Sequence, residues 1–169
     1  MRLLGLDPGL RHTGWGIVDA EGNRLSHVAS GRIDSGEGTI GERLVRLHDG
    51  ITDVIDRYRP DEAAVEETYV NKNPSSPLKL GLARGVVILA PARAGLPVAE
   101  YSPSLVKKSV VGAGQAEKEQ VGRMVRMLLP GAEPGSADAA DALAIAICHA
   151  HHASTRRAVE AGIRAGVRT

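Results

Sequence analysis

The segment from Ser136 to Ala146 places the strongest constraint on how this chain can fold. It predicts a helix from about Ala137 to His152 that is apolar nearly all round, and a helix of this kind is buried in a core. Two aspartates, Asp138 and Asp141, are the exceptions, and their spacing puts them on one face with Cβ atoms about 5–6 Å apart. Because two such carboxylates in an apolar setting repel each other unless a cation holds them, the segment indicates a divalent-metal site.

Further carboxylates end two predicted strands. Residues 2–7 predict a buried strand that ends in Asp7 before a Pro-Gly turn, and residues 62–67 predict a strand that ends in Glu66 and Glu67. Successive strand side chains point to opposite faces, so only one of the two glutamates can face the same site as Asp7. A turn-forming role for Asp7 and a helix-capping role for Asp138 remain alternatives at this point.

The remaining pattern predicts an α/β fold. Two strands at 14–20 and 24–34 flank a hairpin turn at Gly22-Asn23. Another strand is expected at 98–101, and the other helices at 40–58, 78–94, 117–129 and a short stretch after Ser102-Pro103. Three strands and a helix, followed by alternating strands and helices, predict a mixed five-stranded sheet with helices on both faces.

Length and composition indicate one globular domain. The chain has 169 residues, of which 43% are hydrophobic; we place the domain at residues 1–152, followed by a basic tail at 153–169 that frays. The single cysteine, Cys148, excludes a disulfide framework and is typical of a reducing compartment. No segment has the length of a membrane span or the pattern of a signal sequence, so we expect a soluble, cytoplasmic protein.

Charge is distributed unevenly along the chain. The net charge is +1, but residues 1–67 carry a balance of −5 and residues 68–129 one of +6. An acidic site beside a basic middle is typical of an enzyme that acts on a polyanion. The same lysines and arginines also fit an ordinary solvated helix surface, and charge alone does not decide between the two.

Together these segments resemble the ribonuclease-H-like nucleases and, among them, the RuvC family of bacterial Holliday junction resolvases. A Gly-x-Asp strand alone also begins actin-like ATPases, so the first segment is not specific by itself. The matching segments occur in family order with family-like spacing, at residues 5–9, 64–67, 79–85, 106–112, 116–118 and 137–146.

The resemblance implies a structure-selective endodeoxyribonuclease that resolves four-way (Holliday) DNA junctions by paired symmetric nicks during recombination and repair. It selects Glu66 over Glu67, and it implies that Asp7, Glu66, Asp138 and Asp141 are catalytic and hold two Mg²⁺ or Mn²⁺ ions. One ion would activate a water and the other would stabilise the departing 3′ oxygen, leaving 5′-phosphate and 3′-hydroxyl ends.

DNA contacts follow from the same resemblance. Lys107 and Lys118 match positions that contact DNA near the scissile phosphate, and Lys72 and Lys108 are expected to extend this basic track. Tyr69 matches an aromatic residue that stacks on bases at the junction centre, an interaction that tolerates any sequence.

Two protein partners are also expected: a second copy of the chain and a branch-migration motor. The run Leu80–Ala90 is apolar nearly all round and carries small residues that let a partner helix come close, so it predicts the helix that joins a homodimer. A charge at Val87 is then expected to produce monomers.

Other functions are consistent with parts of the pattern. A ribonuclease-H-like nuclease acting on RNA would share the carboxylates but not the dimer helix. An actin-like ATPase would need a second copy of the domain, for which 169 residues leave no room. A non-catalytic DNA-binding relative would not need all four carboxylates.

Overall fold

The computed structural model describes the backbone of residues 1–67 and 75–166, and the side chains of residues 1–67 and 78–153. Five strands form one mixed sheet in the order β3-β2-β1-β4-β5. β1 pairs antiparallel with β2 and parallel with β4; β2 is antiparallel to β3, and β4 is parallel to β5. The strands are β1 (Arg2–Asp7), β2 (His12–Glu21), β3 (Arg24–Asp34), β4 (Glu62–Glu66) and β5 (Val98–Tyr101).

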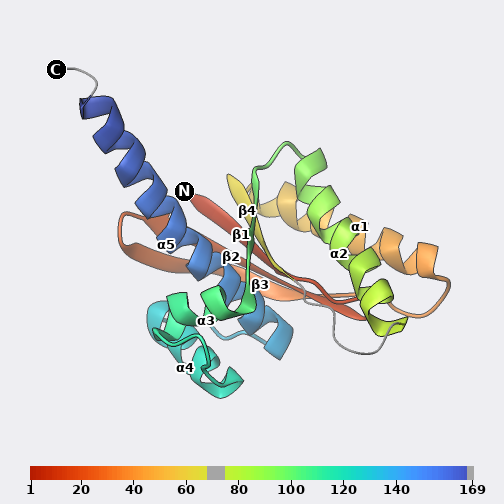
Figure 1. Ribbon diagram of the computed structural model, residues 1–169. Coiled ribbons are helices and arrows are strands. Elements are labelled where there is room, and N and C mark those ends of the chain that lie inside the picture. Colours follow the sequence, from red (N-terminus) through yellow and green to blue (C-terminus); the bar gives the residue numbers. More distant parts are fainter. Residues whose placement is uncertain (68–74, 167–169) are drawn as a thin grey trace.

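Helices cover both faces of this sheet, which confirms the predicted α/β architecture (Figure 1). One face is covered by α1 (Ile40–Tyr58) and α2 (Ser75–Arg93), and the other by α5 (Ala137–Gly166) with α3 (Pro103–Val111) and α4 (Lys118–Leu128) packed beside it. α5 runs on to Gly166, well beyond the His152 end that its apolar pattern indicates. None of the helices in the described part of the chain has the length and apolar character needed to cross a membrane.

Alternation along the strands divides the side chains between the two faces. On β1, Leu4 and Leu6 are fully buried toward α1 and α2. Gly5 lies against the backbone of α5 on the opposite face, and Asp7, two residues on, shares that face. Glu66, at the end of β4, lies on the same face by the same alternation. The carboxylates at the ends of these two strands therefore face the start of α5.

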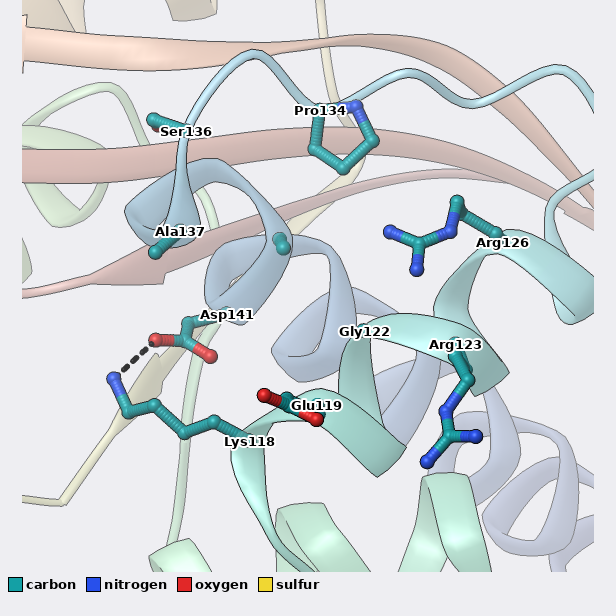
Figure 2. A pocket seen from close by; sticks show the side chains of 10 residues that line it. Lys118, Glu119, Gly122, Arg123, Arg126, Pro134, Ser136, Ala137 and Asp141 are labelled. Carbon is teal, nitrogen blue, oxygen red and sulfur yellow. Dashed lines mark hydrogen bonds and ion pairs between the residues drawn. The ribbon is translucent and has the colours of Figure 1, made fainter.

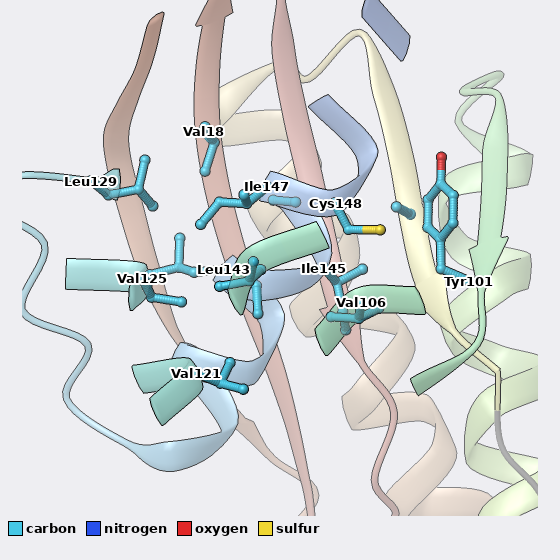
Figure 3. Packing of buried hydrophobic residues seen from close by; sticks show 14 of the residues in the cluster. Val18, Tyr101, Val106, Val121, Val125, Leu129, Leu143, Ile145, Ile147 and Cys148 are labelled. Atoms are coloured by element: carbon cyan, nitrogen blue, oxygen red, sulfur yellow. The ribbon is translucent and has the colours of Figure 1, made fainter. Parts of the chain in front are cut away.

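The core beneath α5 is aliphatic and joins this helix to α3 and α4 (Figure 3). Its buried members include Val106 from α3, Val121 and Val125 from α4, and Leu143 and Ile147 from α5. Because α3 and α4 both pack against α5 through these residues, the lysines on those two helices are held in a fixed relation to the aspartates of α5.

A second aliphatic core lies between the sheet and the helices α1 and α2. Val87 belongs to it and is fully buried, in the same cluster as Ile51 and Ile55 of α1. The expectation that Val87 faces a partner subunit is therefore wrong, because its side chain is used to attach α2 to its own domain. The exposed apolar side chains of α2 are instead Leu78, Leu82 and Leu89.

Candidate active site

Four carboxylates meet at one edge of the sheet. Asp7 ends β1 and Glu66 ends β4; because these strands are parallel neighbours, their carboxyl ends lie at the same edge. Asp138 and Asp141 lie in the first turns of α5, which crosses this edge. The electrostatic effect of Glu66, Asp138 and Asp141 on the pKa of Asp7 shows that all four charges are close together.

The start of α5 is fixed by a serine rather than by either aspartate. The Ala139 amide donates a hydrogen bond to Ser136 Oγ (3.1 Å), and the Ala140 amide donates one to the Ser136 carbonyl (3.2 Å). This is the pattern of a helix N-cap. The alternative role of Asp138 as the capping residue is thereby removed, and its carboxylate is available to the site.

Glycines on the sheet bring α5 unusually close to the strands. A Cβ at Gly14 would lie 2.0 Å from the Asp138 carbonyl oxygen, and one at Gly5 would lie 2.1 Å from the Ala142 carbonyl oxygen. Both distances are far inside van der Waals contact, so no side chain fits at either position. Gly14 is also the cross-strand partner of Asp7. The absent side chain at Gly14 thus sets how near Asp138 stands to Asp7.

Burial and like charge raise the proton affinity of the two strand carboxylates. The pKa of Asp7 is raised to about 7, first by burial and then by the charges of Asp141, Glu66 and Asp138. The pKa of Glu66 is also raised, chiefly by burial and then by Asp141, while Lys118 and Lys107 act in the opposite direction. Such carboxylates resist ionisation until a cation compensates their charge.

Lys118 supplies one such cation. Its ammonium donates a hydrogen bond to Asp141 Oδ2 at 3.0 Å, and the pair is shown by the dashed line in Figure 2. The side chain of Asp141 is 30% exposed and that of Lys118 is 79% exposed. The apolar pattern around Asp141 indicates a buried charge that only a metal would compensate; in the structure Asp141 is partly exposed and α4 brings Lys118 to it.

The donor set suits a hard divalent cation. Four carboxylates supply only oxygen ligands, which favour Mg²⁺ or Mn²⁺ over zinc. Among the described residues, no three metal-binding side chains are close enough to hold one ion as they stand. The carboxylates repel one another, as the raised pKa of Asp7 reflects, and a bound divalent ion would relieve this repulsion. The residues therefore fit a divalent metal.

A hollow of about 260 Å³ opens beside three of these carboxylates, and Asp138 does not line it. Asp7, Glu66 and Asp141 line it together with Lys107 of α3 and Lys118 of α4. Lys108, the next residue on α3, is exposed and does not line the hollow. The structure thus brings both lysines matched to family positions to the carboxylates. Tyr69 and Lys72 lie outside the residues whose structure is described, so their predicted DNA contacts stay predictions.

Sequence reasoning missed several residues that shape this site. Gly14 had no signal beyond being a glycine inside a predicted strand, which does suggest a close approach of another backbone. Arg123 and Arg126 of α4 line an adjoining hollow and were read only as part of the general basic charge. The place of Gly14 and of the two arginines beside the site follows from packing against α5 and not from the local sequence pattern.

Comparison with known proteins agrees with this geometry. The family model described as "Crossover junction endodeoxyribonuclease RuvC" matches residues 3–149. A protein of that name from Paramagnetospirillum magneticum is 66% identical over 158 residues, which cover 93% of this chain and 95% of that protein. The one from Rhodospirillum rubrum is 65% identical over 153 residues, or 90% of each.

Solved structures agree as well. RuvC of T. thermophilus, in complex with a Holliday junction substrate, matches with a TM-score of 0.85 at 36% identity, over 92% of this chain and 96% of that one. The yeast mitochondrial Holliday junction resolvase matches with a TM-score of 0.67 at 12% identity, over 92% of this chain and 80% of that one; that likeness shows a shared fold alone. From its sequence, its fold and its converging carboxylates, this chain belongs to the RuvC family of crossover junction endodeoxyribonucleases.

Proposed function

We propose that this protein resolves four-way DNA junctions by cutting two opposed strands symmetrically, leaving 5′-phosphate and 3′-hydroxyl ends. As a RuvC nuclease it is a divalent-metal-dependent crossover junction endodeoxyribonuclease. The observation that carries the proposal is the convergence of Asp7, Glu66 and Asp141 with Lys107 and Lys118 around one hollow. A site of this kind holds cations through its carboxylates and a phosphate through its ammonium groups.

The roles of the residues follow from their positions. Asp7, Glu66, Asp138 and Asp141 would hold two Mg²⁺ or Mn²⁺ ions. When bound, such a pair supplies Lewis-acid assistance to the attacking and departing oxygens of an in-line displacement. Lys107 lines the same hollow as Glu66, and its charge, like that of Lys118, lowers the pKa of that carboxyl.

Lys118 donates a hydrogen bond to Asp141. Asp141 would be one of the metal-holding carboxylates, and the Lys118 ammonium beside it would hold the scissile phosphate. The two lysines come from different helices, α3 and α4, and line one hollow, so together they are placed to orient the phosphate, which lowers the entropic part of the barrier.

The same reasoning supports a homodimer that joins through α2. Leu78, Leu82 and Leu89 are 69%, 43% and 49% exposed on this helix, so α2 offers apolar side chains to a second copy. A two-fold axis between protomers would present one site to each of two opposed strands. Family membership also supports a branch-migration motor as a partner, Tyr69 and Lys72 as further DNA contacts, and a cytoplasmic location.

Cleavage assays on matched substrates test the reaction. A synthetic four-way junction should be nicked in pairs, while a linear duplex of the same arm sequence and an RNA–DNA hybrid should remain intact. Preferred cleavage of the hybrid would contradict junction resolution and favour an RNA-directed nuclease of the same fold.

Substitution separates the carboxylates from the lysines. Asp7→Asn, Glu66→Gln and Asp141→Asn should abolish cleavage yet leave junction binding largely intact, because affinity comes from contacts to many phosphates. Lys107→Ala should weaken both cleavage and binding, and should flatten the salt dependence of binding by roughly one counterion. Loss of both functions in a folded Asp7→Asn protein would overturn the assignment.

A further inference from the structure

A second hollow adjoins the one above the carboxylates. It has a volume of about 640 Å³ and lies between α4 and the start of α5. Lys118 and Asp141 line both hollows, so the two are continuous at these residues. We call the second hollow the α4 groove. It leads away from the carboxylates along α4, past Arg123 and Arg126 (Figure 2).

Besides Lys118, two exposed arginines line the α4 groove. Arg123 and Arg126 are exposed, three residues apart on α4, while Val121 and Val125 attach the helix to the core. No ion pair found among the described side chains uses either arginine. Figure 2 shows Arg126 extending from α4 toward Pro134 and the start of α5. Two exposed guanidinium groups that do not tie α4 down are available to an external anion.

Negative charge in the groove is limited. Asp141 is already engaged by Lys118, and a metal at the site would occupy it more fully. Glu119 is the other carboxylate that lines the groove, and it stands four residues before Arg123 on the same helix. Arg126 has no carboxylate at this spacing on its N-terminal side, where Gly122 stands. The N-terminus of α5, which is the positive end of its helix dipole, also faces the groove, because Ser136 and Ala137 line it.

We propose that the α4 groove binds the phosphodiester backbone of the cleaved strand to one side of the scissile phosphate, with Arg123 and Arg126 as the contacts. This inference rests on the proposed function, since it extends the substrate path of the same site. Guanidinium groups bind phosphate oxygens in a bidentate manner and remain charged at any working pH. A backbone ligand also explains why the hollow is much larger than a single anion requires.

Helix geometry sets the length of this path. Arg126 is eight residues beyond Lys118, which corresponds to about 12 Å along α4. At about 3.4 Å of rise per nucleotide in one strand, this distance spans roughly three nucleotides. The contacted phosphates therefore lie within about three nucleotides of the scissile one. Because Lys118 and both arginines belong to one rigid helix, binding in the groove sets which phosphate reaches the carboxylates.

Junction binding as a function of salt tests the groove. In the full-length protein without divalent metal, the double substitution Arg123→Gln and Arg126→Gln should weaken junction binding at least about tenfold at low salt and reduce the salt slope by about two. Arg24→Gln is the matched control, because Arg24 is an exposed arginine at the hairpin between β2 and β3, at the opposite end of the strands from Asp7. It should change neither quantity.

Neutral phosphates locate the contact. Methylphosphonates placed one at a time within three nucleotides of the cleavage site should weaken binding to the unaltered protein at one or two positions. The same positions should have no further effect on the double variant. An unchanged salt slope, or equal losses with both proteins at every position, would overturn the groove as a backbone site.

The proposed function has a separate readout in the same experiment. If the unaltered protein fails to nick junctions, but the double arginine variant still loses junction affinity and salt dependence, then junction resolution is wrong and the groove remains a backbone-binding site. If the unaltered protein nicks junctions and the double variant binds them equally well, then the groove is not a backbone-binding site and the proposed function is retained.

Discussion

Gly14 shows how one missing side chain can determine the geometry of a catalytic site. Its Cα faces the Asp138 carbonyl across a gap that admits no methyl group, and its cross-strand partner is Asp7. Two residues proposed to share a metal are therefore brought together by a third that carries no functional group. Gly14 acts as a positioning residue, and it does so through the backbone of α5.

Replacing Gly14 by alanine should damage metal binding before it damages DNA binding. The new Cβ must push the first turn of α5 away by about 1 Å, and a displacement of this size costs about 100-fold in a reaction that depends on alignment. We expect the Mg²⁺ concentration for half-maximal cleavage to rise at least tenfold, with metal-free junction affinity unchanged. Gly41→Ala is the control, since a Cβ there meets nothing within 4 Å. An unaltered Mg²⁺ requirement in folded Gly14→Ala would contradict this role.

Asp7 should make metal-free stability depend on pH. The pKa of Asp7 is about 7 in the folded protein against 3.8 in the unfolded chain. The contribution of Asp7 to the free energy of unfolding is therefore most favourable below pH 4 and is lost as the pH rises toward 7. Asp7→Asn should therefore stabilise the metal-free protein at pH 8 by roughly 2 kcal/mol after allowance for solvent screening. At pH 4 the two proteins should be nearly equal. Urea unfolding of both proteins at pH 4 and pH 8 checks this. If the free energies of unfolding of the two proteins differ by the same amount at both pH values, ionisation of Asp7 is not the cause of the pH dependence.

Lys118 should compete with the metal ion for Asp141 as well as bind DNA. Its ammonium already compensates Asp141, so Lys118→Ala should raise the Mg²⁺ affinity measured by calorimetry. The gain should be only about two- to fivefold, because an ion pair this exposed is worth about 1 kcal/mol or less. Cleavage should fall in the same variant. Lys108→Ala, on the exposed side of α3, should leave Mg²⁺ affinity as it is; a fall in affinity in Lys118→Ala would contradict the competition.

At the scale of elements, α2 uses its two sides for different purposes. Ala83, Val87 and Ala90 are buried against the domain, whereas Leu82 and Leu89 face outward. A charge at Val87 would disrupt the core rather than a dimer. The outward side is the surface available to a second copy.

Leu82→Glu together with Leu89→Glu should yield folded monomers. A buried carboxylate at a subunit interface costs several kcal/mol, whereas in an isolated subunit both positions meet water. Light scattering should show half the mass, and junctions should be nicked singly rather than in pairs. Val45→Glu, at an exposed apolar residue of α1, should change neither the mass nor the paired nicking. Retention of the dimer in the double variant would exclude this surface of α2.

The elements themselves could largely be predicted from the sequence, because alternation and helical periodicity are local signals. The strand from Arg2 to Asp7 and the helix from Ile40 to Tyr58 agree with their patterns. What the pattern of α2 could not reveal is which side packs inward, since its apolar residues surround the helix. The site was predictable as residue types at element ends. The Lys118–Asp141 pair was not, because it depends on how α4 packs against α5.

At the scale of the whole molecule, the two sheet faces have different tasks. The face beneath α1 and α2 carries an aliphatic core and, on the outer side of α2, an apolar surface. The face beneath α5 carries the carboxylates, and α3 and α4 supply the basic side chains around them. In the proposed homodimer, this separation would let subunit contact and DNA contact occur without competing for surface.

The position of α5 in the chain has a consequence for biosynthesis. Every strand of the sheet is translated before α5, yet α5 alone covers the glycine-lined face of β1 and β2. A nascent chain emerging from the ribosome can pair its strands and pack α1 and α2 on one face, but the other face remains exposed to solvent until α5 is synthesised. Docking of this helix buries the face and delivers Asp138 and Asp141 in the same event. A chain without α5 therefore lacks both the cover of this face and two of the four carboxylates proposed to hold metal.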